Sequence, residues 1–270
     1  MRKVETYERF EGHLAAWSDG DVPRLAVLGP TGVGKSQGYS TALGNRRYHL
    51  FSGRLTPLEL YLRLYDAPDL PVVLDDISAL LRHNDFRDML KGLCETGTRT
   101  IRWGTTTPLL KGRNTSTQCN SPVLIVLNKV PKNDPDVEAV LDRCDVIRFE
   151  PAKAEIIARM RFLFPEDWEL IDLIEELPAL PSLRTLIKAQ QWKKSKHLNL
   201  VEELLSECGV SGPIAGLVRI MESCPEEEWC ARYVEETKLT DRTYRRHKYF
   251  AEQIVGCRRP PDECPIVQLQ

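Results

Sequence analysis

No apolar run in this sequence approaches the roughly 18 residues that a membrane-spanning helix needs, the longest being Val123 to Leu127 with its neighbours. The N-terminal segment from Met1 to Phe10 is charged and lacks the apolar core of a secretory signal peptide. None of the eight cysteines stands in a C-x-x-C pair. These absences predict a soluble, cytoplasmic protein with free thiols and no membrane contact.

A strong net charge is absent as well, since the formal charge is only −2 at pH 7. This balance gives no global field that would draw the chain to nucleic acid, so such a contact must use a local patch. The 270 residues contain no internal repeats, and they suffice for one large domain or two smaller ones with cores of their own.

The most informative segment fits the pattern G-x-x-x-x-G-K-[ST] and follows an apolar run, Leu25 to Leu28, that predicts a buried strand. In this pattern the glycines let backbone N–H groups turn toward phosphate oxygens, at the positive end of the next helix. Lys35 would neutralise the β- and γ-phosphates of ATP, and Ser36 would place its hydroxyl on Mg²⁺. The alternative is a glycine-rich turn with a solvated lysine. The residues predicted to bind the nucleotide are Gly29, Pro30, Thr31, Gly32, Val33, Gly34, Lys35 and Ser36.

Short apolar runs alternate with helical patterns in the first half of the chain, which predicts an α/β fold with a doubly wound parallel sheet. The strands are expected at residues 25–28, 47–52, 71–74, 99–103, 123–127 and 146–149. The helices are expected at residues 4–17, 35–44, 57–67, 78–95 and 134–143. Residues 105–120 are polar and predict a mobile insertion. From Ala152 onward only helical periodicity remains.

Polar residues follow two of these apolar runs: Asp75 and Asp76 after one, Asn128 after another. The carboxyl ends of parallel strands meet in one crevice, so all three are expected beside the phosphate loop. Asp75 is the predicted Mg²⁺ ligand, together with Ser36. Asp76 points to the other side of the pleat and could polarise an attacking water. The alternatives are two helix-capping acids and an asparagine in a turn.

The order and spacing of these motifs resemble the AAA+ branch of P-loop ATPases from residue 20 to residue 190. Walker A matches Gly29 to Ser36, Walker B matches Val72 to Asp76, sensor 1 matches Asn128, and the box with an arginine finger matches Leu141 to Cys144. The resemblance implies ATP binding and Mg²⁺-dependent hydrolysis. Most of the family has Asp-Glu in Walker B, so the shorter Asp76 implies a slow, switch-like ATPase as readily as a motor. The motifs look similar to replication initiators, helicase loaders and clamp loaders without naming a subfamily.

The resemblance also implies two functional arginines. Arg143 would be the finger that reaches the γ-phosphate of the next subunit in a ring or helical oligomer, and its alternative is a cation at a helix C-terminus. Arg184 stands where a helical lid carries a second sensor arginine, and its alternative is an ordinary surface arginine. The predicted catalytic residues are therefore Lys35, Asp76, Asn128 and Arg143.

The C-terminal region predicts two helices, at residues 226–236 and 240–254, with the spacing of a helix-turn-helix. The second helix would carry a basic face that could contact DNA, and its alternatives are a solvated face or a face docked on a neighbouring subunit. Cysteines and His247 concentrate here, but their spacing is poor for a zinc site. The basic face consists of Arg242, Arg245, Arg246 and Lys248.

The sequence thus predicts a nucleotide-binding core at residues 1–150, an all-α lid at 151–207 and a small C-terminal helical module at 208–270. The leading hypothesis is an oligomeric AAA+ ATPase that couples ATP to loading or remodelling of a protein on DNA. The runner-up is a nucleotide-gated adaptor that recruits a partner enzyme, with hydrolysis incidental. A third hypothesis, a P-loop kinase for a small substrate, would require an active monomer.

Overall fold

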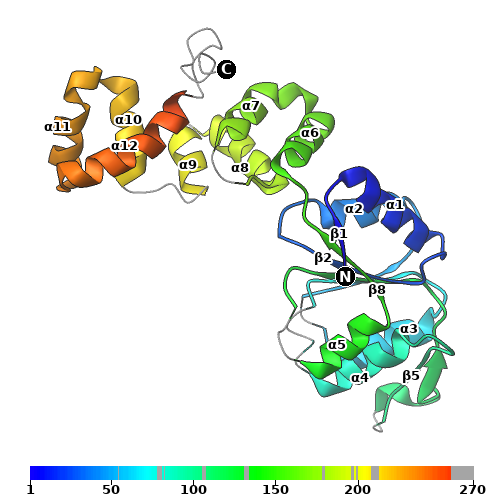
Figure 1. The fold of residues 1–270 in the computed structure, drawn as a ribbon. Helices are drawn as coiled ribbons and strands as arrows, with labels where there is room; N and C mark the ends of the chain where they lie inside the picture. The colour runs from blue at the N-terminus through cyan, green and yellow to red at the C-terminus, as the bar shows by residue number, and fades with distance from the viewer. Residues whose placement is uncertain are drawn as a thin grey trace. The chain divides into compact units, whose positions relative to one another are not determined.

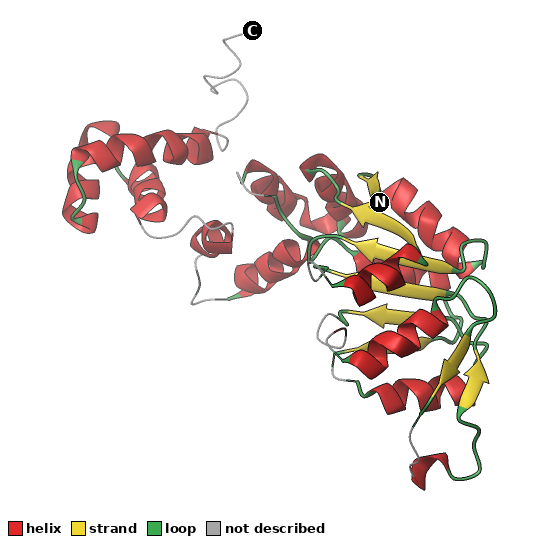
Figure 2. Ribbon diagram, turned by 60° about the horizontal axis from the view of Figure 1, so that its bottom comes forward, coloured by secondary structure: helices red, strands yellow, loops and turns green. Residues whose placement is uncertain are grey.

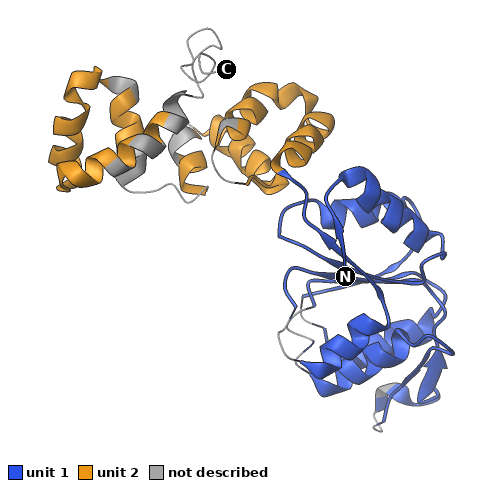
Figure 3. Ribbon diagram, viewed as in Figure 1, with its two compact units in different colours: residues 1–152 blue, residues 153–270 orange. Residues whose placement is uncertain are grey.

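The computed structural model describes residues 1–53, 55–77, 81, 83–104, 108–130, 134–177, 180–195, 198, 200–207 and 213–256. The chain divides into two compact units, Met1–Ala152 and Lys153–Gln270 (Figure 3). In the described residues, every strand belongs to the first unit and the second unit is helical. The further division of the second unit into a lid and a C-terminal module stays a prediction.

Six strands of the first unit form one parallel sheet, which confirms the predicted α/β fold (Figure 2). Their order across the sheet is β1-β8-β2-β7-β4-β3. The central strands are buried along almost their whole length, because helices cover both faces of a sheet of this type. The strands are β1 (Arg2–Val4), β2 (Arg24–Leu28), β3 (His49–Ser52), β4 (Val72–Asp75), β7 (Val123–Leu127) and β8 (Asp145–Phe149).

Helices cover both faces of this sheet. Figure 1 shows α1 (Tyr7–Ser18) and α2 (Lys35–Leu43) on one face, and α3 (Pro57–Asp66), α4 (Asn84–Leu93) and α5 (Pro135–Asp142) on the other. The start of α3 follows the predicted signals, since the Thr56 hydroxyl accepts a hydrogen bond from Glu59 N at 3.2 Å and proline follows the cap.

The strand order gathers three predicted site segments at one edge. β7 lies between β2 and β4, with Leu28 opposite Leu127 and Asp75 opposite Val126. The chain therefore leaves β2, β4 and β7 at nearly the same level. This is the carboxyl edge of the sheet, where ligands bind in open α/β sheets.

Two element boundaries differ from the sequence-based expectation. Arg2–Val4 forms β1, which pairs in parallel with β8, whereas the sequence predicted a helix from residue 4 and no strand before it; the helix, α1, begins at Tyr7. Three residues are too few to show a strand's alternation. The helix expected from residue 78 begins at Asn84, because His83 before it is extended, with φ −94° and ψ 123°. Residues 78–80 and 82 lie outside the described residues.

The polar insertion is partly folded rather than simply a mobile loop. β5 (Thr100–Arg102), which confirms the expected extra strand, pairs antiparallel with β6 (Ser116–Gln118), and a short 3₁₀ helix, η2 (Pro108–Leu110), lies between them. The insertion is anchored to α3, since Tyr61 donates to the Asn114 carbonyl at 2.7 Å. Residues 105–107 lie outside the described residues.

The second unit is built from helices joined by short connections, as the sequence predicts from Ala152 onward. α8 begins with a capping box in which Ser182 and Thr185 exchange hydrogen bonds. No helix in the described part of the chain combines the length and apolar character that crossing a membrane requires. The helices are α6 (Lys153–Leu163), η3 (Pro165–Asp167), α7 (Trp168–Glu176), α8 (Leu183–Lys194), α9 (Leu200–Glu207), α10 (Pro213–Ser223), α11 (Glu226–Thr237) and α12 (Asp241–Gly256).

Candidate functional site

The predicted phosphate loop turns between β2 and α2 at the carboxyl edge of the sheet. Gly32 and Gly34 have φ values of 77° and 87°, in the left-handed region that favours glycine. Gly29 needs glycine for another reason, because a Cβ there would lie 2.2 Å from the carbonyl oxygen of Phe149 on β8. The loop thus combines unusual dihedral angles with a close backbone approach.

Lys35 opens α2 and is only 6% exposed. Its ammonium donates to the carbonyl oxygens of Gly29 at 2.7 Å and Pro30 at 2.5 Å, and to Asn128 Oδ1 at 2.9 Å. A buried charge needs partners of this kind. The ammonium therefore lies against the carbonyls of its own loop, and a phosphate oxygen could replace one of these acceptors with a charge-assisted pair.

Two hydroxyl groups of α2 meet one carboxylate oxygen of β4. Ser36 Oγ donates to Asp75 Oδ2 at 2.7 Å, and Tyr39 donates to the same oxygen at 3.0 Å. Burial first, and then the charge of Asp75, raises the pKa of Tyr39 well above its ordinary value, so its hydroxyl stays protonated. The predicted metal ligands Ser36 and Asp75 are therefore adjacent.

Asn128 connects the loop to the second acid. Its Oδ1 accepts from Lys35, while its Nδ2 lies 3.4 Å from Asp76 Oδ1. Asp76 has φ 55°, a left-handed conformation in which aspartate is several times more frequent than most residues. Asp76 takes this conformation directly after β4 ends at Asp75. Hydrogen bonds thus join Lys35, Asn128 and Asp76 in one group and Ser36, Tyr39 and Asp75 in a second group at the same edge of the sheet.

The loop is also held from the N-terminal segment. Tyr7 of α1 donates to the Val33 carbonyl at 3.0 Å in a buried position. Its ring meets Phe149 edge-on at 5.2 Å, and Phe10 stacks on the same ring at 4.0 Å. This aromatic cluster fixes the loop against β8.

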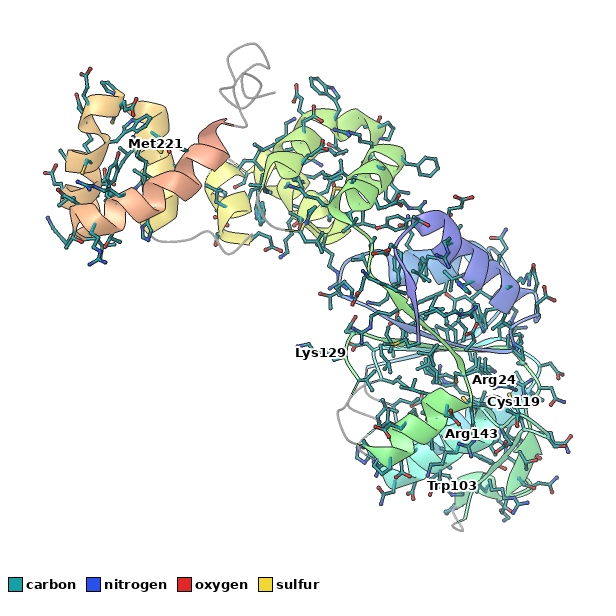
Figure 4. All side chains as sticks on the ribbon, viewed as in Figure 1. Arg24, Trp103, Cys119, Lys129, Arg143 and Met221 are labelled. Atoms are coloured by element: carbon teal, nitrogen blue, oxygen red, sulfur yellow. The ribbon has the colours of Figure 1, made fainter. Side chains whose placement is uncertain are left out.

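Arg143 lies at the other edge of the sheet, as the C-cap of α5. Its Nε is 3.4 Å from Glu95 Oε2, and its Nη1 donates to the Ala139 carbonyl at 2.6 Å. A hydrogen bond from Thr96 N, and then the one from Arg143, lowers the pKa of Glu95, which stays ionised. Figure 4 shows Arg143 well apart from Lys129, the residue that follows Asn128.

The strand register gives the scale of this separation. Asp145, two residues after Arg143, pairs with Leu25, whereas the phosphate loop begins after Leu28. At about 3.3 Å per residue, the four residues from Leu25 to Gly29 put the level of Asp145 about 13 Å from the start of the loop along the strands, and Arg143 precedes Asp145. The structure therefore does not bring Arg143 into the group around Lys35.

Arg184, the predicted second sensor, is exposed in the first turn of α8. It belongs to the second unit, whereas the phosphate loop belongs to the first. Its approach to a nucleotide stays a prediction.

The predicted basic face of the C-terminal region lies on α12. Arg242 and Arg245 are exposed, and the Arg246 side chain lies outside the described residues. Lys248 instead pairs with Glu226 at 2.9 Å and lies over the Trp229 ring at 5.4 Å. In the described part, the candidate DNA contacts are therefore Arg242 and Arg245.

The donor set at the carboxyl edge fits a nucleotide with Mg²⁺. Oxygens of Ser36 and Asp75 are hard ligands of the type that Mg²⁺ prefers, and they are already within hydrogen-bond distance of each other. Lys35 and the glycine conformations suit phosphate. No group of three or more histidine, cysteine or carboxylate side chains that could hold a metal by themselves occurs among the described residues. Cys257 and Cys264 lie outside them.

Sequence reasoning missed Tyr39, Tyr7 and Glu95. Tyr39 had a usable signal, because it lies three residues after Ser36 and hence on the same side of the helix. Tyr7 and Glu95 meet their partners only through the fold, 26 and 48 residues away in the sequence.

No family model and no curated protein matches this sequence. Among solved structures, the chain is similar to NtrX from Brucella abortus, determined in complex with ADP. The TM-score is 0.51 at 11% identity, and the match covers 90% of this chain and 68% of that chain. Together with the parallel sheet, the similarity supports an α/β fold of the kind found in that structure.

Proposed function

We propose that this chain binds and hydrolyses ATP with Mg²⁺, and that it does so as an oligomer. The observation that carries the proposal is a pair of hydrogen-bonded groups at the carboxyl edge: Lys35 and Asp76 both contact Asn128, and Ser36 contacts Asp75. NtrX, which has a similar fold, was determined with ADP bound. That similarity supports nucleotide binding.

The proposed roles follow from the chemistry of each group. The loop amides and Lys35 bind the phosphates, and the ammonium neutralises their charge. Ser36 and Asp75 would hold Mg²⁺, which supplies positive charge at the β- and γ-phosphates when bound. Asp76 accepts a proton from, or orients, the attacking water, and Asn128 orients Asp76 through its amide.

In the proposed oligomer, Arg143 of one copy completes the nucleotide site of another copy. Arg143 precedes Asp145, which lies about 13 Å along the strands from its own phosphate loop at about 3.3 Å per residue, so Arg143 does not reach its own nucleotide without a large rearrangement. In the proposed oligomer it stabilises the charge that develops on the nucleotide of the neighbouring copy.

Two substitutions test this proposal. Lys35→Ala should abolish ATP binding measured by calorimetry. Arg143→Ala should keep binding but lower turnover by a factor on the order of 10³, the low end of what arginine fingers contribute. Equal loss of binding and turnover in Arg143→Ala would contradict the trans role.

We further propose that the oligomer loads or remodels a protein on DNA. The exposed Arg242 and Arg245 on α12 support this role, with exposed Lys238 in the preceding turn. Replacing both arginines by glutamine should weaken DNA binding in a fluorescence anisotropy titration and reduce its salt slope by about 1 for each lost phosphate contact. Arg232→Gln is the matched control, because Arg232 is also exposed but pairs with Glu228 on α11. An unchanged titration after the double substitution would remove DNA from the proposal.

A second candidate, a nucleotide-gated adaptor with incidental hydrolysis, is favoured by one residue. Asp76 is a methylene shorter than glutamate and lies in a left-handed conformation next to Asn128. If hydrolysis is incidental, Asp76→Glu should raise turnover without raising protein loading on DNA. A rise in both would favour the hydrolysis-driven machine.

A further inference from the structure

Arg24 stands at the start of β2 and bridges two segments that are far apart in the sequence. Its Nε donates to the Arg143 carbonyl at 3.0 Å, and its Nη1 donates to the Glu95 carbonyl, also at 3.0 Å. Figure 4 shows Arg24 and Arg143 in the same region of the first unit. Because both acceptors are backbone carbonyls, the Arg24 guanidinium restrains the main chain itself at Glu95 and Arg143.

These carbonyls belong to the ends of two helices. Arg143 is the C-cap of α5, and Glu95 follows Cys94, the C-cap of α4. Carbonyls at a helix C-terminus lack helical partners and carry partial negative charge, which favours a cation. The planar Arg24 guanidinium therefore links the C-terminal ends of α4 and α5 to the start of β2 through hydrogen bonds.

The side chains at the two tethered positions pair with each other. The Arg143 guanidinium lies against Glu95 and the carbonyl of Ala139, so it is drawn back along its own helix. The Arg143 side chain is still 30% exposed. To act on another copy, it has to leave Glu95 while its backbone remains tethered to Arg24.

We propose that Arg24 is a positioning residue for catalysis in trans: it fixes the backbone from which the Arg143 side chain exchanges Glu95 for a neighbour's nucleotide. The inference rests on the proposed function, because it requires Arg143 to act in trans. A purely structural Arg24 would only stabilise the fold. The two roles differ because a positioning defect leaves the chain's own nucleotide site, at the other end of β2, intact.

Mixing variant chains separates these roles. Arg143→Ala chains keep a nucleotide site but lack the finger, and Asp76→Asn chains keep the finger but lack the acid. Mixed oligomers contain interfaces in which an intact finger meets an intact site, so turnover should return. Arg24→Gln alone should lose turnover about 100-fold, since a misplacement of about 1 Å can cost that much. When Arg24→Gln chains are mixed with Asp76→Asn chains, turnover should recover as it does when Arg143→Ala chains are mixed with them.

Two variants control for loss of the fold. Arg24→Lys keeps the charge but not the planar fork of donors, and it should share the turnover defect while unfolding at nearly the wild-type temperature. Arg99→Gln removes another arginine that ties distant carbonyls, those of Ser121 and Asn120, without contacting Arg143. It should retain turnover below its unfolding temperature.

The outcomes separate the inference from the proposal beneath it. Recovery of Arg24→Gln supports a positioning role. No recovery of Arg24→Gln, when Arg143→Ala recovers, overturns that role and leaves the proposed function standing. No recovery of Arg143→Ala overturns catalysis in trans itself. If Arg24→Gln does not fold, Arg24→Lys chains are mixed with Asp76→Asn chains instead, and recovery of turnover is again the result that supports the positioning role.

Discussion

At the residue scale, the carboxylate of Asp75 is oriented by two hydroxyl groups from one helix. Ser36 belongs to the phosphate-loop pattern, whereas Tyr39 does not. Burial, and then the charge of Asp75, raises the pKa of Tyr39, whose hydroxyl donates to this carboxylate. Tyr39 is therefore an orienting group whose removal spares every predicted ligand of the metal.

Tyr39→Phe should raise the Mg²⁺ concentration needed for half-maximal turnover several-fold. The lost hydrogen bond contributes about 1 kcal/mol, and Asp75 would keep only one hydroxyl donor. The measurement is a Mg²⁺ titration of ATP hydrolysis. Tyr48→Phe is the control, because the Tyr48 ring contacts Tyr39 edge-on while Tyr39 keeps its bond to Asp75. An unchanged titration in Tyr39→Phe would exclude the orienting role.

Gly29→Ala should destabilise the protein, although alanine is a conservative change. The new Cβ would lie 2.2 Å from the Phe149 carbonyl oxygen, and overpacking of this kind costs about 1–3 kcal/mol. Gly12→Ala on α1 is the matched control, since nothing lies within 4 Å of its Cβ. It should stabilise the helix by about 0.5–1 kcal/mol. Chemical denaturation measures both, and equal effects would contradict the close approach at Gly29.

Single residues were predictable where a local pattern specifies them. Lys35 and Ser36 stand at fixed positions in the phosphate loop, and Asp75 ends an apolar run, so eight or fewer neighbouring residues suggested each role. Arg24 reaches across 71 and 119 residues to its two acceptors. No local pattern encodes a contact of that kind, because only the strand order brings the partners together.

At the element scale, helix α1 supports the phosphate loop although it precedes the motif in the sequence. Its amphipathic pattern predicted the helix, and Phe10 and Leu14 are buried on the side of α2. A Cβ on Gly38 would approach both of them within 3 Å, so α1 and α2 pack closely. The pattern identified the apolar face of α1 but not its partner.

Tyr7→Phe should lower both stability and ATP affinity. The buried Val33 carbonyl would lose a donor, which costs about 1–3 kcal/mol when no other partner replaces it. Thermal unfolding and a nucleotide titration measure the two effects. Tyr65→Phe is the control, because its hydroxyl contacts Asn114 of the insertion at 3.3 Å. If both variants bound ATP like the wild type, α1 would have no part in shaping the loop.

Element boundaries were predictable where sequence signals coincide. β7 is apolar at all five positions, and α3 has a capping threonine followed by proline, so both were expected within a residue or two. β1 was missed because its three residues carry no period, and its strand character comes from pairing with β8. The start of α4 was predicted too early because apolar periodicity continues through residues that precede its cap.

At the scale of the whole molecule, the nucleotide group and Arg143 lie at opposite edges of one sheet. If the proposed function holds, a single copy binds ATP without a finger at its own site. Turnover per chain should then rise with protein concentration, and the rise should be cooperative, because each proposed active site needs two copies. The measurement is the specific hydrolysis rate over a dilution series, with Lys35→Ala as the blank.

A rate per chain that stayed constant on dilution, in a sample shown to be monomeric by light scattering, would contradict this expectation. It would favour an enzyme complete in one copy. Adding DNA to the same series separates assembly from stimulation, since DNA that only promotes assembly should lose its effect at high protein concentration.

In the proposed oligomer, the opposed edges also make each copy directional, with one face that donates an arginine and a different face that receives one. A contact between unlike faces is heterologous, and its repetition either closes on itself or continues as a filament. An open filament always ends in one copy whose nucleotide receives no arginine, so a larger fraction of the nucleotide sites is incomplete in a short filament. In a closed ring every site receives an arginine. The fraction of bound ATP that remains after a single turnover would therefore measure the proportion of filament ends. A measurable fraction would indicate open filaments, and none would indicate closed rings.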